Sequence, residues 1–179
     1  MVFAHDTDMA LASAIALVNS AEDPDTLTTI EELDAFFAEY DYTGRHDADD
    51  AELAQVRALR PVLRRLLTAE RDEAAAQVNA ILADARAVPQ LVQHAGFDWH
   101  IHATTSQTAF AVRVAVETAM AMIDVIRADE LSRIFSCADD TCDALVVDLS
   151  RNRSKRFCST TCGNRNAVAA YRARKQSGR

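Results

Sequence analysis

The four cysteines of this 179-residue chain all lie in its last quarter, and they restrict the fold there more than any other feature. They form two close pairs, Cys137-x4-Cys142 and Cys158-x3-Cys162, separated by fifteen residues. Two such pairs suit a tetrahedral zinc site, because each pair makes a tight turn and the chain between them brings the turns together. The spacing therefore predicts one zinc ion held by Cys137, Cys142, Cys158 and Cys162.

Two disulfides or four unrelated thiols are the alternatives. The N-terminal segment MVFAHDTDMA has no basic region followed by an apolar run, so it does not resemble a secretory signal. No apolar stretch approaches the length of a membrane span. We therefore expect a cytoplasmic protein without membrane contact, and paired cysteines in that compartment usually hold metal.

Charge is strongly segregated along the chain. All 27 acidic residues precede residue 149, whereas residues 149–179 carry nine Lys or Arg and no acid. The net charge of -8 thus combines an acidic body with a basic tail. Such a tail predicts an acidic partner, which is nucleic acid, an acidic protein or the body of this chain itself.

The body is predicted to be mostly helical, because alanine is abundant and apolar residues recur at helical spacing. A first helix, capped by Asp6 or Thr7, should run to about Ser20. Thr28 and Glu31 have the spacing of a capping box, which predicts a second helix through residue 40.

Three further helices are expected over residues 50–67, 72–86 and 108–131. Pro61 should kink or split the first of these. The last is the longest periodic segment and is predicted to be central to the core. Its apolar stripe is Val112, Val116, Met120, Ile123 and Ile126, widened by Phe110, Val114, Ala121 and Val125.

Residues 88–104 break the helical rhythm. A turn-like Ala95-Gly96 and an alternation of apolar and polar residues predict a small β-hairpin there. The fold class is therefore mostly α, with a helical domain over residues 1–136 that contains this hairpin. A C-terminal, treble-clef-like zinc module with four cysteine ligands is expected over residues 137–179.

Histidines and aspartates offer a candidate small-molecule or second metal site in the body. His5, Asp6 and Asp8 lie together, and His100 and His102 share one face of the predicted strand. They form a site if the N-terminus packs near the hairpin. The alternative is that Asp6 caps a helix and the histidines face solvent. The chain has no nucleophile motif, phosphate-binding glycine loop or HExxH pattern, so we do not expect an enzyme.

In the cysteine module the sequence predicts a strand over residues 144–149, a second strand over 155–157 and a helix that begins after Cys158 and runs to about Lys175. Four thiolates would complete the tetrahedron, so the zinc is expected to be structural. Metal binding should supply much of the folding energy of so short a module, roughly 10–16 kcal/mol by comparison with finger peptides. Val168 and Tyr171 are predicted to pack on the hairpin that these two strands of the module form.

The basic residues of the module are the candidate contacts to nucleic acid. They come from the turn between the cysteine pairs and from the last helix: Arg151, Arg153, Lys155, Arg156, Arg165, Arg172, Arg174 and Lys175. For Asn164 and Arg165 we expect helix-start and charge-pairing roles, and phosphate contact is the alternative for Arg165.

Cys162-Gly163-Asn164-Arg165, within the run D-L-S-R-N-R-S-K-R-F-C-S-T-T-C-G-N-R, resembles the CGNR zinc-finger proteins. The opening F-A-H-D-T-D, the A-L-V-N at residues 16–19 and the hairpin near Trp99 resemble the ABATE-type domain that usually precedes this finger. The last two cysteines are one residue closer than in many members, and Phe157 stands where many have Trp. Neither departure threatens the metal site.

The resemblance implies zinc on the four cysteines and DNA binding by the finger of a bacterial, stress-linked transcriptional regulator. An unknown small-molecule effector would act through the body. A single short helix rarely gives high specificity, so a DNA-binding form is expected to be a homodimer with two half-sites. The competing interpretation is a protein-interaction or RNA-associated zinc module that does not bind duplex DNA.

Overall fold

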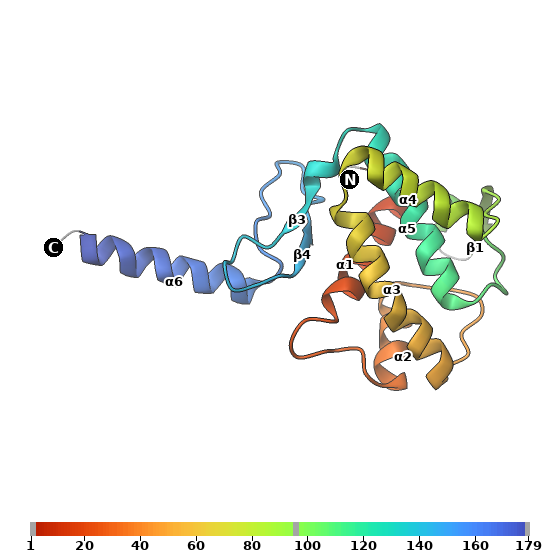
Figure 1. Ribbon diagram of the computed structural model, residues 1–179, viewed down its shortest axis with the longest axis horizontal. Helices are drawn as coiled ribbons and strands as arrows, with labels where there is room; N and C mark the ends of the chain where they lie inside the picture. Colours follow the sequence, from red (N-terminus) through yellow and green to blue (C-terminus); the bar gives the residue numbers. More distant parts are fainter. Residues whose placement is uncertain (1–2, 95–96, 178–179) are drawn as a thin grey trace.

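The computed structural model describes residues 3–94 and 97–177 (Figure 1). That part of the chain is mostly helical, as predicted, and it contains two small antiparallel sheets. The helices are α1 (His5–Asn19), α2 (Ile30–Glu39), α3 (Asp50–Thr68), α4 (Arg71–Asp84), α5 (Phe110–Arg127) and α6 (Thr160–Ser177), with a 3-10 turn at Leu131–Arg133. The strands are β1 (Gln90–His94), β2 (Phe97–His102), β3 (Ile134–Ser136) and β4 (Leu145–Val147).

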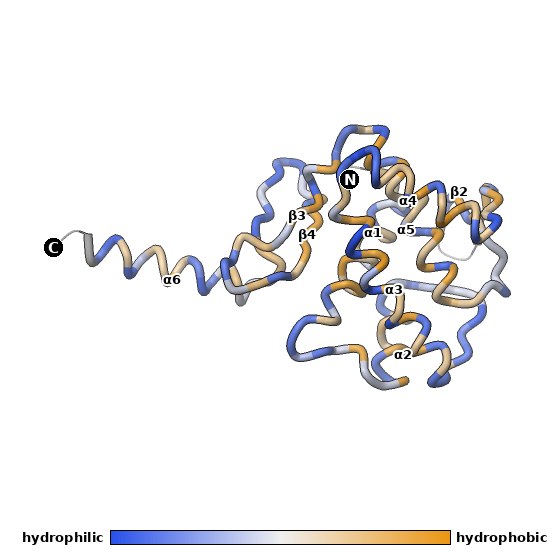
Figure 2. The backbone as a smooth tube through the Cα atoms, in the orientation of Figure 1, coloured by the Kyte–Doolittle hydropathy of each residue, from blue (hydrophilic) through white to orange (hydrophobic). Residues whose placement is uncertain are grey.

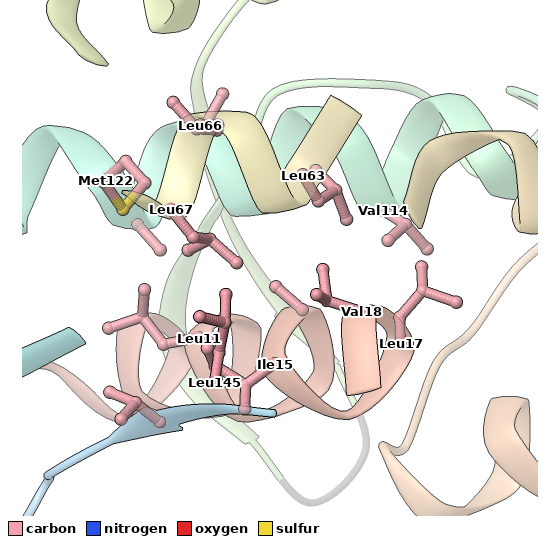
Figure 3. Close-up of a cluster of buried hydrophobic side chains, with 14 of the residues drawn as sticks. Leu11, Ile15, Leu17, Val18, Leu63, Leu66, Leu67, Val114, Met122 and Leu145 are labelled. Atoms are coloured by element: carbon pink, nitrogen blue, oxygen red, sulfur yellow. The ribbon is translucent and has the colours of Figure 1, made fainter. Parts of the chain in front are cut away.

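The core of the body lies between α1, α3 and α5 (Figure 3). Leu11 and Leu17 of α1, Leu63 and Leu66 of α3 and Met122 of α5 are completely buried. Each leucine buried in this way stabilises the fold by about 1.5–3 kcal/mol relative to an exposed one. Because these residues are far apart in the sequence, their packing fixes the three helices against one another.

Two helix starts differ from the predictions. The second helix does begin with a capping box, but its members are Thr29 and Glu32 rather than Thr28 and Glu31. The carboxylate of Glu32 accepts hydrogen bonds from the backbone N–H groups of both Thr28 and Thr29. Glu32 therefore satisfies two backbone donors at the start of the helix, although it lies one residue after the predicted Glu31. Helix α1 begins at His5, with no side-chain cap at Ala4. The predicted capping of this helix by Asp6 or Thr7 is therefore wrong.

Helix α3 continues through Pro61, so the predicted alternative of a split helix is wrong. Proline removes the hydrogen bond to the carbonyl four residues earlier, which here belongs to Arg57. Both Pro61 and Arg57 lie on the exposed side of α3, where water can hydrate that carbonyl. The helix survives because the missing bond faces solvent.

Helix α5 is shorter than predicted and buried on more than one side. Val116 is fully buried as expected, but Val112 is 37% exposed, so its predicted inward orientation is wrong. Helices α1, α3 and α4 all pack against α5, and Val114 and Val125, which were predicted to widen the stripe, are buried. A helix with several packed neighbours has no single buried stripe.

The predicted β-hairpin is present, and Val92 of β1 pairs with His100 of β2. Its turn, Ala95-Gly96, lies outside the described residues. Trp99 and Ile101 are 64% and 43% exposed, whereas His100 and His102 are half-buried. The histidines therefore do not face open solvent, because this side of β2 is turned toward α1 and α5.

Candidate metal centre and nucleic-acid interface

The four predicted metal ligands converge beside the first turn of α6. Cys137 follows β3, Cys142 precedes β4, Cys158 precedes α6 and Cys162 lies within it. Their Sγ atoms are all within 4.8 Å of one another, and the pairs Cys142–Cys158 and Cys158–Cys162 are 3.6 and 3.7 Å apart. Zn–S bonds of about 2.3 Å in a tetrahedron separate the sulfurs by about 3.8 Å. The four cysteines are free thiols, and their geometry fits zinc.

The surroundings of the thiols also favour a bound cation. Burial by itself would raise the pKa of Cys137, but backbone N–H groups of Cys158 and Asp139 donate to its sulfur and lower that pKa overall. Burial and the neighbouring thiols raise the pKa of Cys158 to about 12. Four thiols this close ionise together only when a metal ion offsets their charge.

The sheet of the cysteine module is formed differently from the prediction. Strand β4 pairs with β3, through Ile134↔Val147 and Ser136↔Leu145, and not with residues 155–157. The predicted second strand fails because the backbone N–H of Lys155 donates to the carboxylate of Asp148 instead of a neighbouring strand. The β3–β4 pair holds the first cysteine turn at its open end.

Asp139 joins the first cysteine turn to α6. It is 3% exposed and accepts from Asn166 at 2.9 Å and from Arg165 at 3.3 Å, while Thr141 closes the turn by donating its N–H and hydroxyl. Donation by Thr141 is the main cause that lowers the pKa of Asp139. Arg165 therefore pairs with a nearby negative charge, as expected. No sequence signal had indicated that Asp139 is its partner.

Helix α6 extends away from the rest of the molecule (Figure 1). Cys162 is buried at its start, but every residue from Ala167 to Lys175 is exposed. Val168 and Tyr171 are 47% and 61% exposed, so their predicted packing on the hairpin is wrong. The β3–β4 hairpin lies against the body instead, and the outer turns of α6 extend past it into solvent.

Two family models match the chain. The model named ABATE, described as "Putative stress-induced transcription regulator", matches residues 11–129, which is more than half of the chain. The model of the CGNR zinc finger matches residues 133–175. The chain belongs to the ABATE family and carries a CGNR zinc finger. No curated protein matches it.

The four cysteines of the CGNR finger form a site for one zinc ion, which confirms the predicted cofactor. Both families are of regulator and zinc-finger type, and neither description names a catalytic activity. Within the described part of the chain, no helix is both long enough and apolar enough to span a membrane. The division between residues 136 and 137 stays a prediction, and β3 lies on its N-terminal side.

Some cations of the CGNR finger are engaged within the protein. Arg153 forms an ion pair with Glu130 and donates to Ser132, which ties the loop between the cysteine pairs to the end of the body. The guanidinium of Arg156 lies 5.7 Å from the ring centre of Phe157. Together with Arg165, these residues use part of their charge to hold the finger in shape.

Four other cations are exposed and have no ion-pair partner in the part of the chain that the structure describes. They are Arg151 and Lys155 in the loop and Arg172 and Lys175 on α6. Arg174 is also exposed on α6. These side chains are the ones best placed to contact an external anion.

The CGNR finger is docked on the body through its hairpin. The side chain of Asn19, at the end of α1, donates to the carbonyl of Leu145 at 2.8 Å and accepts its N–H at 2.7 Å. Leu145 and Val147 of β4 are buried in the same cluster as the helical core. Figure 2 shows β4 as hydrophobic, whereas much of α6 is hydrophilic. The hairpin is fixed to the body, while the outer part of α6 is surrounded by solvent.

The structure also brings the start of α1 beside the β1–β2 hairpin, as the candidate ligand site required. His5, Asp6, His100 and His102 line one cavity of about 480 Å³, and the carboxylate of Asp6 accepts the N–H of Ile101 at 3.3 Å.

The residues that line this cavity differ from the predicted set at two positions. Asp8 does not line the cavity, because it lies on another side of α1, where burial raises the pKa of its carboxyl. Glu117 of α5 does line it, and sequence analysis missed this residue. Its only signal was an acid between Val116 and Thr118 within an apolar helix.

Proposed function

We propose that this protein is a transcriptional regulator that binds duplex DNA through α6 and the loop between its cysteine pairs. One observation carries the proposal. The outer turns of α6 stand clear of the body, fully exposed, with basic side chains and no acid. The family description of a transcription regulator supports the same function.

The face of α6 suits a groove of DNA. At about 100° per residue, Val168, Arg172, Lys175 and Tyr171 fall within roughly 100° of the helix circumference. Cations therefore alternate with an aliphatic and an aromatic side chain on one face. A helix about 10–12 Å in diameter fits the major groove, which is about 12 Å wide. The cations would contact phosphates, and the apolar side chains would lie near base edges.

The loop cations add a second contact. Arg151 and Lys155 are exposed on the same finger, and Arg153 holds their loop against the body. Of the 27 acids, 23 precede residue 137, and residues 149–179 carry none, so the body repels DNA while the basic end of the finger attracts it. This asymmetry orients the protein with its finger toward the duplex.

Single substitutions in the zinc-loaded full chain test the proposal. Arg172→Ala and Lys175→Ala should each weaken binding to random duplex DNA and lower the slope of log K against log salt by about 0.9. Arg65→Ala, which removes an exposed cation from α3, is the matched control and should leave both unchanged. Equal behaviour of Arg172→Ala and Arg65→Ala would refute α6 as the contact.

RNA is the other nucleic acid that the basic tail predicts, and a duplex RNA of the same length distinguishes the two. DNA binding through the major groove should be reduced on RNA, because the deep and narrow major groove of A-form helices excludes an α-helix. Tighter binding to RNA would replace this proposal with the RNA-associated alternative.

A further inference from the structure

A second site lies in the body, away from the finger. The cavity that contains His5 and His102 is enclosed by the start of α1, strand β2, helix α5 and the loop that follows α2. Its volume of about 480 Å³ is within the range of about 300–1,000 Å³ typical of small-molecule sites. The cavity is therefore large enough for an organic ligand rather than a few waters.

The walls of the cavity are largely apolar and aromatic. They include Met9, Tyr40, Trp99, Ile101, Met120 and Ile123. Aromatic faces attract cations through their quadrupole and also bury hydrocarbon surface. The walls favour a ligand with a hydrocarbon or aromatic part.

The charges around the cavity are mainly negative. Five carboxylic acids line it: Asp6, Asp41, Asp98, Glu117 and Asp124. The only arginine or lysine among its lining residues is Arg127. Three histidines and two tyrosines also line the cavity. The Nε2 atoms of His100 and His102 lie 2.9 Å apart, within hydrogen-bond distance of each other. An excess of acids in a partly closed cavity attracts cations and repels anions.

Glu117 is the acid at the inner wall. Its side chain is 25% exposed, and its Oε1 lies 3.9 Å from Nδ1 of His102. Burial raises the pKa of Glu117 to about 7, against the effect of Arg113. A carboxylate in such surroundings is stabilised by any cation that enters the cavity.

A bound metal ion is a poorer occupant than an organic cation. In the part of the chain that the structure describes, the only group of cysteine, histidine or acidic side chains close enough to hold a metal is the cysteine cluster of the finger. Apolar walls also offer no oxygen ligands to a hydrated metal ion, whereas they bury the organic part of an amine.

We propose that this cavity binds a small organic cation, an amine or quaternary ammonium on a hydrocarbon or aromatic body, with the Glu117 carboxylate as its counter-ion. This site is independent of DNA binding by the finger. Binding joins a partly buried charge to its opposite and removes apolar surface from water at the same time.

Trp99 provides the readout, because it is the only tryptophan of the chain and it lines the cavity. The probe is benzyltrimethylammonium, titrated into the zinc-loaded full chain while Trp99 emission is recorded. Neopentylbenzene, its neutral isostere, and phenylacetate, an anion of similar size, are the comparison ligands. We expect a saturable change with the cation at least tenfold tighter than with either comparison ligand.

Glu117→Gln keeps the shape of the side chain and removes its charge, and it should weaken binding of the cation at least tenfold. Glu31→Gln is the matched control, because it removes an exposed acid on α2, away from the cavity. Circular dichroism of both variants should be recorded to check that the fold is kept. Absence of saturable binding, equal affinity for phenylacetate, or unchanged affinity in Glu117→Gln would each overturn the proposal.

Discussion

Glu117 is expected to make the stability of the protein fall as the pH rises, and Glu117→Gln should remove that loss. Its pKa is about 7 in the folded protein against an ordinary value of 4.5. Between these two pH values the folded state holds more protons than the unfolded state, so unfolding becomes easier with increasing pH. Above pH 7 the penalty is constant.

The size of the effect follows from the two pKa values. At about 1.36 kcal/mol per pH unit, ionised Glu117 destabilises the fold by about 3 kcal/mol at pH 8 and by about 1.4 kcal/mol at pH 5.5. The other titratable groups near this carboxyl are Arg113 on α5, His102 on β2 and Tyr42 in the loop. Of these, only Arg113 appreciably lowers the pKa of Glu117.

Urea unfolding followed by circular dichroism at pH 5.5 and pH 8 measures this difference. Glu117→Gln should be more stable than the parent protein at both pH values, by about 3 kcal/mol at pH 8 and about half of that at pH 5.5. Glu31→Gln, on an exposed face, should show no such pH dependence. A glutamine variant that is no more stable at pH 8 would refute the assignment of Glu117 as a carboxylate destabilised by burial.

The remaining predictions concern the metal site and the core. Removal of zinc by a chelator should abolish DNA binding and lower the helix content, while the body stays folded; one zinc per chain, measured by mass spectrometry, should restore both. Asp139→Ala should weaken zinc affinity about 10–100-fold in a chelator competition, because Arg165 and Asn166 lose their shared acceptor, whereas exposed Asp140→Ala should not. Leu63→Ala should lower the free energy of unfolding by about 2–5 kcal/mol, measured with urea, and unchanged stability would contradict its burial.

The features that sequence predicted correctly are local ones. The spacing of Cys137, Cys142, Cys158 and Cys162 indicated the metal site, because each pair sits within one turn of chain. The helices of the body and the β1–β2 hairpin followed from the periodicity of neighbouring residues. These signals need no knowledge of what packs against them.

The features that sequence missed depend on contacts between distant segments. Strand β3 was not predicted, because three residues carry no clear period and its partner β4 lies beyond the first cysteine turn. Glu117 was missed because its place in the cavity depends on how α5 packs beside β2 and α1. The exposure of Tyr171 likewise depends on where the finger hairpin docks, and Asn19 of the body determines that position.

The measurement that tests the central claim most directly is fluorescence anisotropy of the zinc-loaded chain on random duplex DNA, titrated from low to physiological salt. Four exposed cations without ion-pair partners in the described part of the chain, Arg151, Lys155, Arg172 and Lys175, predict binding at low salt with a slope of log K against log salt of about -3.6 per chain. Binding that is absent at low salt, or that does not depend on salt, would contradict a finger that holds DNA through its exposed basic side chains.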